Sequence, residues 1–172
     1  MSSPGENPQT LTEEMLLSAQ TGDLTKLQSR LVRWETEVAD KSVMHSLNTN
    51  DPIMENFCPA LGFVTYNEAR VSWCLQHGAI PNARNKNKYQ DVPSQAGHYA
   101  SVSTFQLLAA DGANFPCSNV LQRAAESRYK GRMEALQWLL DEAGFPINQH
   151  EFEWDPATFR NWRGNVLGTA LH

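Results

Sequence analysis

Three amphipathic segments of similar design recur along the chain at a nearly constant spacing. Each has apolar residues at helical spacing, then a glycine and a turn: ARVSWCLQHGAIPN (69–82), VSTFQLLAADGAN (102–114) and RMEALQWLLDEAGFPIN (132–148). The glycines are Gly78, Gly112 and Gly144, so the spacings are 34 and 32 residues. A glycine after a helix supplies the positive φ that the C-terminal turn needs. The pattern predicts a repeated unit of two short antiparallel helices, a glycine stop and an irregular connection.

An earlier copy of the unit precedes these three. It reads LTEEMLLSAQTGDLTKLQSRLVRW (11–34), in which TGD joins two short helices. Thr10 and Glu13 have the spacing of a capping box at the start of the first helix. The second helix has a leucine stripe at helical spacing, formed by Leu24, Leu27 and Leu31.

The repeated segments resemble ankyrin repeats. The resemblance is carried by QHGAIPNARN (76–85), QLLAADGAN (106–114), AAESRYKGRMEALQWLLDEAGFPIN (124–148) and the final GTALH. It implies an all-α, ankyrin-like solenoid of stacked antiparallel helix pairs with irregular finger loops. It also implies that the concave face, made by first helices and finger tips, binds a partner, usually another protein.

The chain departs from the family pattern in several places. The interior copies have no complete threonine-proline-leucine-histidine start; the corresponding stretches read FCPALGFV (57–64), DVPSQAGHYA (91–100) and SNVLQRAAES (118–127). We expect a disordered N-terminal tail at 1–10 and one repeat domain at 11–172. Its expected units are about 11–34, 51–82, 91–114 and 118–148, with a partial fifth unit at 164–172 and insertions at 35–50 and 149–163.

The last residues, GNVLGTALH (164–172), resemble the start of that fifth unit. Two explanations are open. The chain is a piece of a longer array, or its last unit is covered by HEFEWDPATFRNW (150–162) or by another molecule. Self-association through this end of the stack is a further alternative.

Composition narrows the class of partner. The 172-residue chain has a net charge of −5, which argues against a general nucleic-acid binder because phosphate contacts need clustered Lys and Arg. The longest apolar run is far shorter than a membrane span, and no secretory signal is visible. The three cysteines lack CxxC spacing and are interpreted as buried packing thiols. We expect a cytoplasmic protein, with the nucleus as an alternative, that binds neither nucleic acid nor membrane.

Three patches are candidates for partner binding. The first is the finger NARNKNKYQD (82–91), which suits an acidic peptide or phosphate, or is simply a solvated loop; its candidate residues are Arg84, Lys86, Lys88 and Tyr89. The second lies on the polar faces of first helices, which must expose polar residues whether or not they bind: His98, Tyr99, Gln122, Arg123 and Glu126.

The third patch is the aromatic-rich insertion HEFEWDPATFRNW, with Phe152 and Trp154 as the candidate contacts. Aromatic residues in a loop need something to pack against, so the insertion is either a lid on the stack or an anchor for a partner. The alternation HEFEWD would also suit a short strand.

No catalytic motif is present. The chain lacks HExxH, a glycine-rich phosphate loop and GxSxG, and we assign no catalytic residue, cofactor or metal. We therefore expect a non-catalytic protein-interaction module that binds another protein or peptide through its concave face and finger loops. The alternative is a small-molecule-binding or catalytic protein on the same scaffold, with a pocket near 150–162 and His98, Tyr99, Glu126 and Trp154 as its acid, base and lining residues.

Overall fold

The computed structural model describes residues 11, 14, 17, 18, 23–37, 60–76, 78–84, 90–162 and 168–170. The regular elements in this part are helices, and the only β-type pairing there is an isolated bridge between Arg84 and Asp91. The helices are α2 (Leu24–Glu37), α4 (Ala60–Phe63), α5 (Glu68–Gln76), α6 (Val92–Tyr99), α7 (Val102–Ala110), the 3-10 helix η2 (Phe115–Cys117), α8 (Val120–Glu126), α9 (Arg132–Asp141) and α10 (Pro156–Trp162). The all-α expectation is confirmed for these residues.

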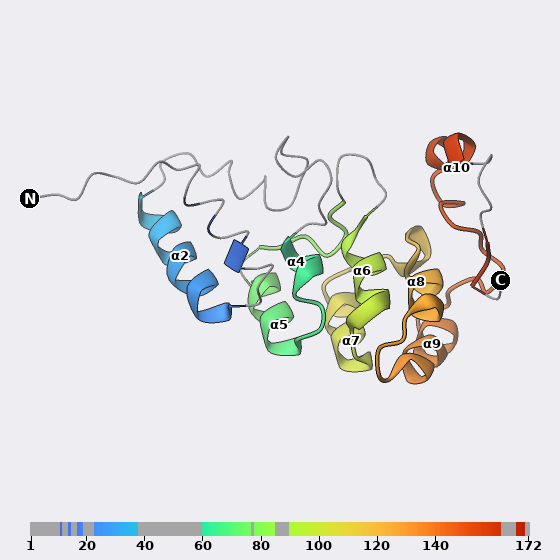
Figure 1. Ribbon diagram of the computed structural model, residues 1–172, viewed down its shortest axis with the longest axis horizontal. Helices are drawn as coiled ribbons and strands as arrows, with labels where there is room; N and C mark the ends of the chain where they lie inside the picture. Colours follow the sequence, from blue (N-terminus) through green and yellow to red (C-terminus); the bar gives the residue numbers. More distant parts are fainter. Residues whose placement is uncertain are drawn as a thin grey trace, which may run out of the picture.

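The helices from α4 to α9 form two rows that pack against each other (Figure 1). In one row α6 contacts α4 on one side and α8 on the other. In the second row α7 contacts α5 and α9, and α8 also contacts α9. Consecutive helix pairs therefore lie side by side in the order of the sequence, from α4 and α5 to α8 and α9.

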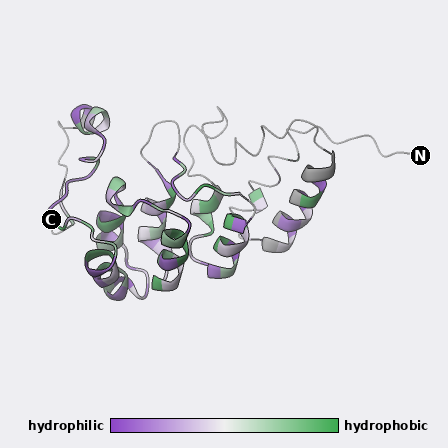
Figure 2. Ribbon diagram, turned by 180° about the vertical axis from the view of Figure 1, so that it is seen from behind, coloured by the Kyte–Doolittle hydropathy of each residue, from purple (hydrophilic) through white to green (hydrophobic). Residues whose placement is uncertain are grey.

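The hydrophobic core lies between the rows. The fully buried side chains include those of Val71 in α5, Leu108 in α7, Leu121 in α8 and Leu139 in α9. An aromatic cluster closes the end of the core, because Trp138 stacks on Phe105 with 5.6 Å between ring centroids, and Phe115 packs edge-on against both rings. Hydrophobic and hydrophilic residues alternate along the ribbon of these helices, as expected when each helix buries one face (Figure 2).

Capping residues and glycines next to the helices in the sequence mark where the helices begin and end. The carboxylate of Asp91 caps α6 by accepting the backbone N–H of Ser94 at 2.7 Å, and the hydroxyl of Ser101 caps α7 in the same way. The three glycines that follow α5, α7 and α9 have φ of 85°, 86° and 65°, so the expected positive φ at Gly78, Gly112 and Gly144 is confirmed.

Polar contacts between neighbouring helix pairs join residues that are far apart in the sequence. The Asn82 side chain donates to the Gly112 carbonyl and accepts the N–H of Asn114, both at 2.7 Å. The buried guanidinium of Arg132 donates to the carbonyls of Gly97 and Ala100 at the end of α6. These partners are separated by 30 to 35 residues. Each pair is therefore tied to the next by hydrogen bonds, exposed at Asn82 and buried at Arg132, as well as by apolar packing.

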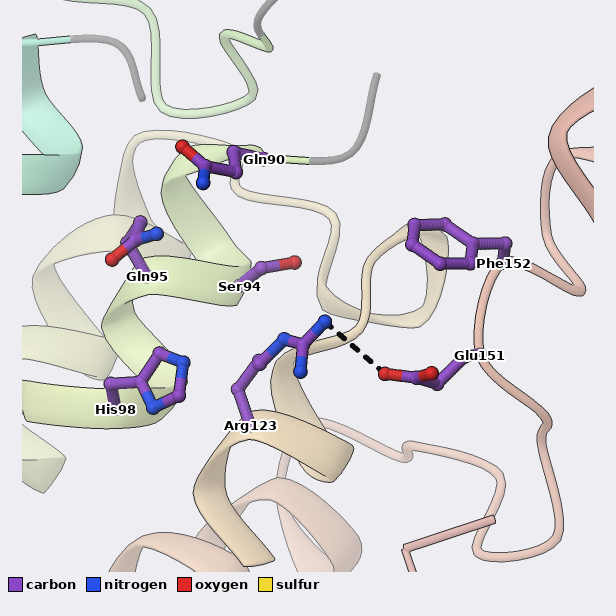
Figure 3. Close-up of a pocket in the computed structure, with 7 residues that line it drawn as sticks. All are labelled: Gln90, Ser94, Gln95, His98, Arg123, Glu151 and Phe152. Atoms are coloured by element: carbon purple, nitrogen blue, oxygen red, sulfur yellow. Dashed lines mark ion pairs between the residues drawn. The ribbon is translucent and has the colours of Figure 1, made fainter. Parts of the chain in front are cut away.

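The backbones of α6 and α8 approach each other closely at Gly97. A Cβ built on Gly97 would lie 2.4 Å from the Val120 carbonyl oxygen and 2.9 Å from Cβ of Arg123. Only glycine fits at this position, because real Cβ contacts are not this short. The contact brings the exposed edges of α6 and α8 together and so positions His98 beside Arg123 (Figure 3).

Candidate functional site

A cavity of about 320 Å³ lies between α6, α8 and the segment that follows α9 (Figure 3). Helix α6 contributes Ser94, Gln95 and His98, and α8 contributes Arg123. Glu151 and Phe152 form the opposite wall, and Gln90, which shortly precedes α6 in the sequence, also lines the cavity. Three of the expected partner-binding residues, His98, Arg123 and Phe152, therefore meet around one cavity.

A second cavity of about 430 Å³ adjoins the first, and Glu151 lies in the walls of both. Its other lining residues are Gln122, Ala125 and Glu126 of α8 and the short segment 168–170. We refer to the two cavities together as the groove, defined by Gln95, His98, Gln122, Arg123, Glu126 and Glu151. The groove therefore brings together residues from different helix pairs that the sequence predicted to bind a partner.

The charges in the groove are arranged around Arg123. Its guanidinium lies 2.8 Å from the carboxylate of Glu126 and 3.2 Å from that of Glu151. Burial raises the pKa of the Glu151 carboxyl, with Arg123 acting in the opposite direction and Glu126 in the same direction. Burial, aided by Arg123, lowers the pKa of His98 and so favours the neutral imidazole.

Asn119 attaches the aromatic insertion to the stack. It is 1% exposed, and its Oδ1 accepts the backbone N–H of Phe152 at 2.8 Å and the indole N–H of Trp154 at 3.3 Å. Its own backbone N–H donates to Ser94 Oγ at 3.1 Å. One asparagine thus connects α6, the start of α8 and the wall of the groove. Asn119 is not among the site residues expected from the sequence, although an asparagine directly before a helix was a visible signal.

Gln122 and Gln149 form a second connection between α8 and the insertion. Gln122 Nε2 donates to the Gln149 carbonyl at 2.7 Å, and Gln149 Nε2 donates to the Pro116 carbonyl at 2.9 Å. Gln122 is 3% exposed, yet its Oε1 has no hydrogen-bond partner in the described part of the chain. A buried acceptor without a partner costs free energy, which a donor that reached this oxygen would recover.

Phe152 has an unusual backbone for a non-glycine residue. Its φ is 58°, in the left-handed region, and the side chain is 5% exposed. Residues 151–154 form turns, so the alternative in which HEFEWD makes a strand is wrong. The left-handed conformation, held by the Asn119 hydrogen bond, turns the Phe152 ring toward the groove (Figure 3).

The other expected site residues lie elsewhere. The guanidinium of Arg84 lies over the Trp154 ring, 4.0 Å from its centroid, and donates to the Cys117 carbonyl. Its charge therefore serves internal packing. Tyr99 is 44% exposed and packs edge-on against Tyr129. Lys86, Lys88 and Tyr89 lie outside the described residues.

The described residues contain no cluster suited to a metal ion, and the Cys74 thiol is not suited to act as a nucleophile. No group of three or more His, Cys, Asp or Glu side chains there could hold a metal ion. The Glu153 carboxylate instead accepts the backbone N–H of His150, and Asp155 accepts the N–H of Ala157 near the start of α10. Burial raises the pKa of the Cys74 thiol to about 12, which is the opposite of what a nucleophile needs.

Comparison with protein-family profiles, with curated proteins and with solved structures finds no match for this chain. Within the described part of the chain, no helix has the length and apolar character needed to cross a membrane.

Proposed function

We propose that the chain is a protein-recognition module with an ankyrin-like repeat architecture, which binds a segment of a partner protein in the groove. The observation that carries the proposal is the convergence of His98, Gln122, Arg123, Glu126 and Phe152, from separate helix pairs and the insertion, on two adjoining cavities. Adjoining polar depressions across successive helix pairs suit an extended peptide segment.

The arrangement of the helices supports the architectural part of this proposal. Helix pairs succeed one another in sequence order, and the polar contacts between pairs recur at separations near the spacing of the glycines. Such an offset is expected when each unit contacts only its neighbours. The resemblance of the sequence to ankyrin repeats points in the same direction.

The composition of the cavities favours a protein partner over a small molecule. A small-molecule site is usually a largely apolar pocket with a few polar groups. The cavity beside Phe152 instead has six polar or charged residues and one aromatic residue in its wall. The depression beside Trp154, of about 430 Å³, is more apolar, with Pro116, Pro146 and Trp154 in its wall, and it is where the small-molecule alternative fits better.

Site-specific photo-crosslinking tests the proposal. A small diazirine amino acid at Ala125, which is exposed in the wall of the second cavity, should form covalent adducts with partner proteins in cells that naturally make the chain. The matched control carries the same group at Met133, which is 76% exposed on α9. We expect discrete protein adducts from the first position and few from the second.

Two outcomes would count against the proposal. Equal adducts from both positions would show non-specific capture. Adducts of small molecules alone, seen as discrete increments in intact mass, would favour the small-molecule alternative.

A further inference from the structure

We propose that the second cavity of the groove is a recognition pocket for a lysine or arginine side chain on the partner segment. This inference rests on the proposed function and specifies the chemistry of its partner. The pocket is formed by Gln122, Ala125, Glu126, Glu151 and the segment 168–170.

The first argument is the charge in the wall of the pocket. Glu126 and Glu151 both line it, and both carboxylates approach the single guanidinium of Arg123. Arg123 can balance one negative charge, so the cluster has one carboxylate in excess. The contact with Glu151 Oε1 is a charge contact without a directed hydrogen bond, because this buried oxygen has no hydrogen-bond partner in the described part. A second cation would complete the cluster.

The second argument is independent of these charges. Gln122 lines the pocket and is 97% buried, and its buried Oε1 accepts no hydrogen bond from the described residues. The amide is oriented by its other end, where Nε2 donates to the Gln149 carbonyl at 2.7 Å. A donor-rich group such as an ammonium or guanidinium would satisfy this acceptor and the two carboxylates together.

The third argument is the shape and polarity of the pocket. Ala125 and Ala170 line it together with Gly168, so part of the wall is small and apolar. Lysine and arginine have long apolar stems with a charged end, which match an apolar wall beside an acidic one. A volume of about 430 Å³ accommodates such a side chain together with ordered water.

The charge of the whole chain favours the same class of partner. A net charge of −5 attracts a basic segment and increases its rate of encounter. The finger 82–91 is also interpreted as a site for an acidic peptide. Arg84 is not available for that role, because its guanidinium is stacked on Trp154. The described part of the chain therefore presents a stronger site for a cation than for an anion.

The test is an NMR titration of the intact isotope-labelled chain with three capped peptides. They share the sequence Gly-Ser-X-Ser-Gly and carry lysine, arginine or norleucine at X. The lysine and arginine peptides should produce saturable shifts of the Gln122 side-chain amide and of the Glu126 and Glu151 carboxylate carbons. The norleucine peptide should bind about fivefold to tenfold more weakly, as expected for loss of a partly exposed charge contact.

Charge-removing variants locate the contact. Glu126→Gln should weaken binding of the lysine peptide about fivefold, and Glu151→Gln should do the same. Glu126 is exposed, so the first variant keeps its fold, which its thermal unfolding curve checks. Glu142→Gln, which removes an exposed carboxylate at the end of α9, is the charge-matched control and should leave binding unchanged.

The outcomes separate this inference from the proposed function. Equal binding of the norleucine peptide, or shifts confined to other helices, would overturn the cation pocket. Equal affinity for butylammonium chloride or calcium chloride would assign the pocket to a free cation and would also overturn the inference. Protein adducts from Ala125 without any lysine or arginine preference would leave the proposed function standing and refute only its basic partner.

Discussion

The replacement Asn119→Ala should detach the wall of the groove while leaving the helix pairs folded. It removes the acceptor of two hydrogen bonds, from the Phe152 N–H at 2.8 Å and from the Trp154 indole N–H at 3.3 Å. The Phe152 N–H would lose this acceptor, which costs about 1–3 kcal/mol, and loss of the longer indole bond costs about 1 kcal/mol. The free energy of opening the segment around Phe152 should therefore fall by about 2–4 kcal/mol.

The left-handed conformation of Phe152 makes this opening local. A non-glycine residue at a φ of 58° costs about 1–3 kcal/mol, and that strain is released when the segment leaves the stack. Hydrogen exchange of the Phe152 amide measures the opening directly. We expect exchange about 30- to 1,000-fold faster in the variant, because each 1.4 kcal/mol corresponds to a factor of ten.

A matched control separates this effect from a general loss of stability. Asn114 is exposed, and its side chain makes no capping hydrogen bond at η2, so Asn114→Ala should leave the exchange of the Phe152 amide unchanged. Amides buried within α7 should keep their protection in both variants. If Asn119→Ala left the Phe152 amide as protected as in the wild type, Asn119 would not be the residue that holds the insertion.

Three further predictions concern the stack that supports the groove. Gly97→Ala should destabilise the chain by about 2 kcal/mol in chemical denaturation, because overpacking against the Val120 carbonyl outweighs the gain of about 1 kcal/mol in helix propensity; a stabilised variant would refute the close contact of α6 and α8. Arg132→Met should cost about 3 kcal/mol by leaving the carbonyls that end α6 unpaired, and a loss below about 1 kcal/mol would show that water replaces the guanidinium. The Cys74 thiol has a pKa raised by burial from 9.0 to about 12, so the unfolded chain ionises first and stability is lost as the pH rises between these values. Relative to Cys74→Ala, the wild type should lose about 1.4 kcal/mol per pH unit in this window, and parallel stability profiles would contradict a buried thiol.

The helices and their ends were predictable because they depend on residues close together in the sequence. Apolar residues at helical spacing and a following glycine define α5, α7 and α9 and the positive φ of the glycines after them. Asp91 and Ser101 are local caps of the same kind. The short turn at 151–154 was not predictable from alternation, because the burial of Phe152 and its bond to Asn119 override the strand-like pattern.

The site was predictable only in part, because its geometry depends on contacts about one repeat apart. The residues of α6 and α8 were expected on one face, and His98 and Arg123 do line the same cavity. The cation–π contact between Arg84 and Trp154 could not be predicted, because the two residues are 70 positions apart in the sequence. Asn119 resembles an ordinary helix cap in the sequence, but in the structure its side chain makes no capping bond to α8.

A charge reversal tests most directly the central claim that the groove recognises a basic partner segment. The two ligands are capped Gly-Ser-Lys-Ser-Gly and Gly-Ser-Glu-Ser-Gly, and the measurement is the ratio of their affinities for the wild type and for Glu126→Lys. The excess carboxylate beside Arg123 predicts that the wild type prefers the lysine peptide and that the variant prefers the glutamate peptide. An unchanged ratio in the variant would contradict the claim.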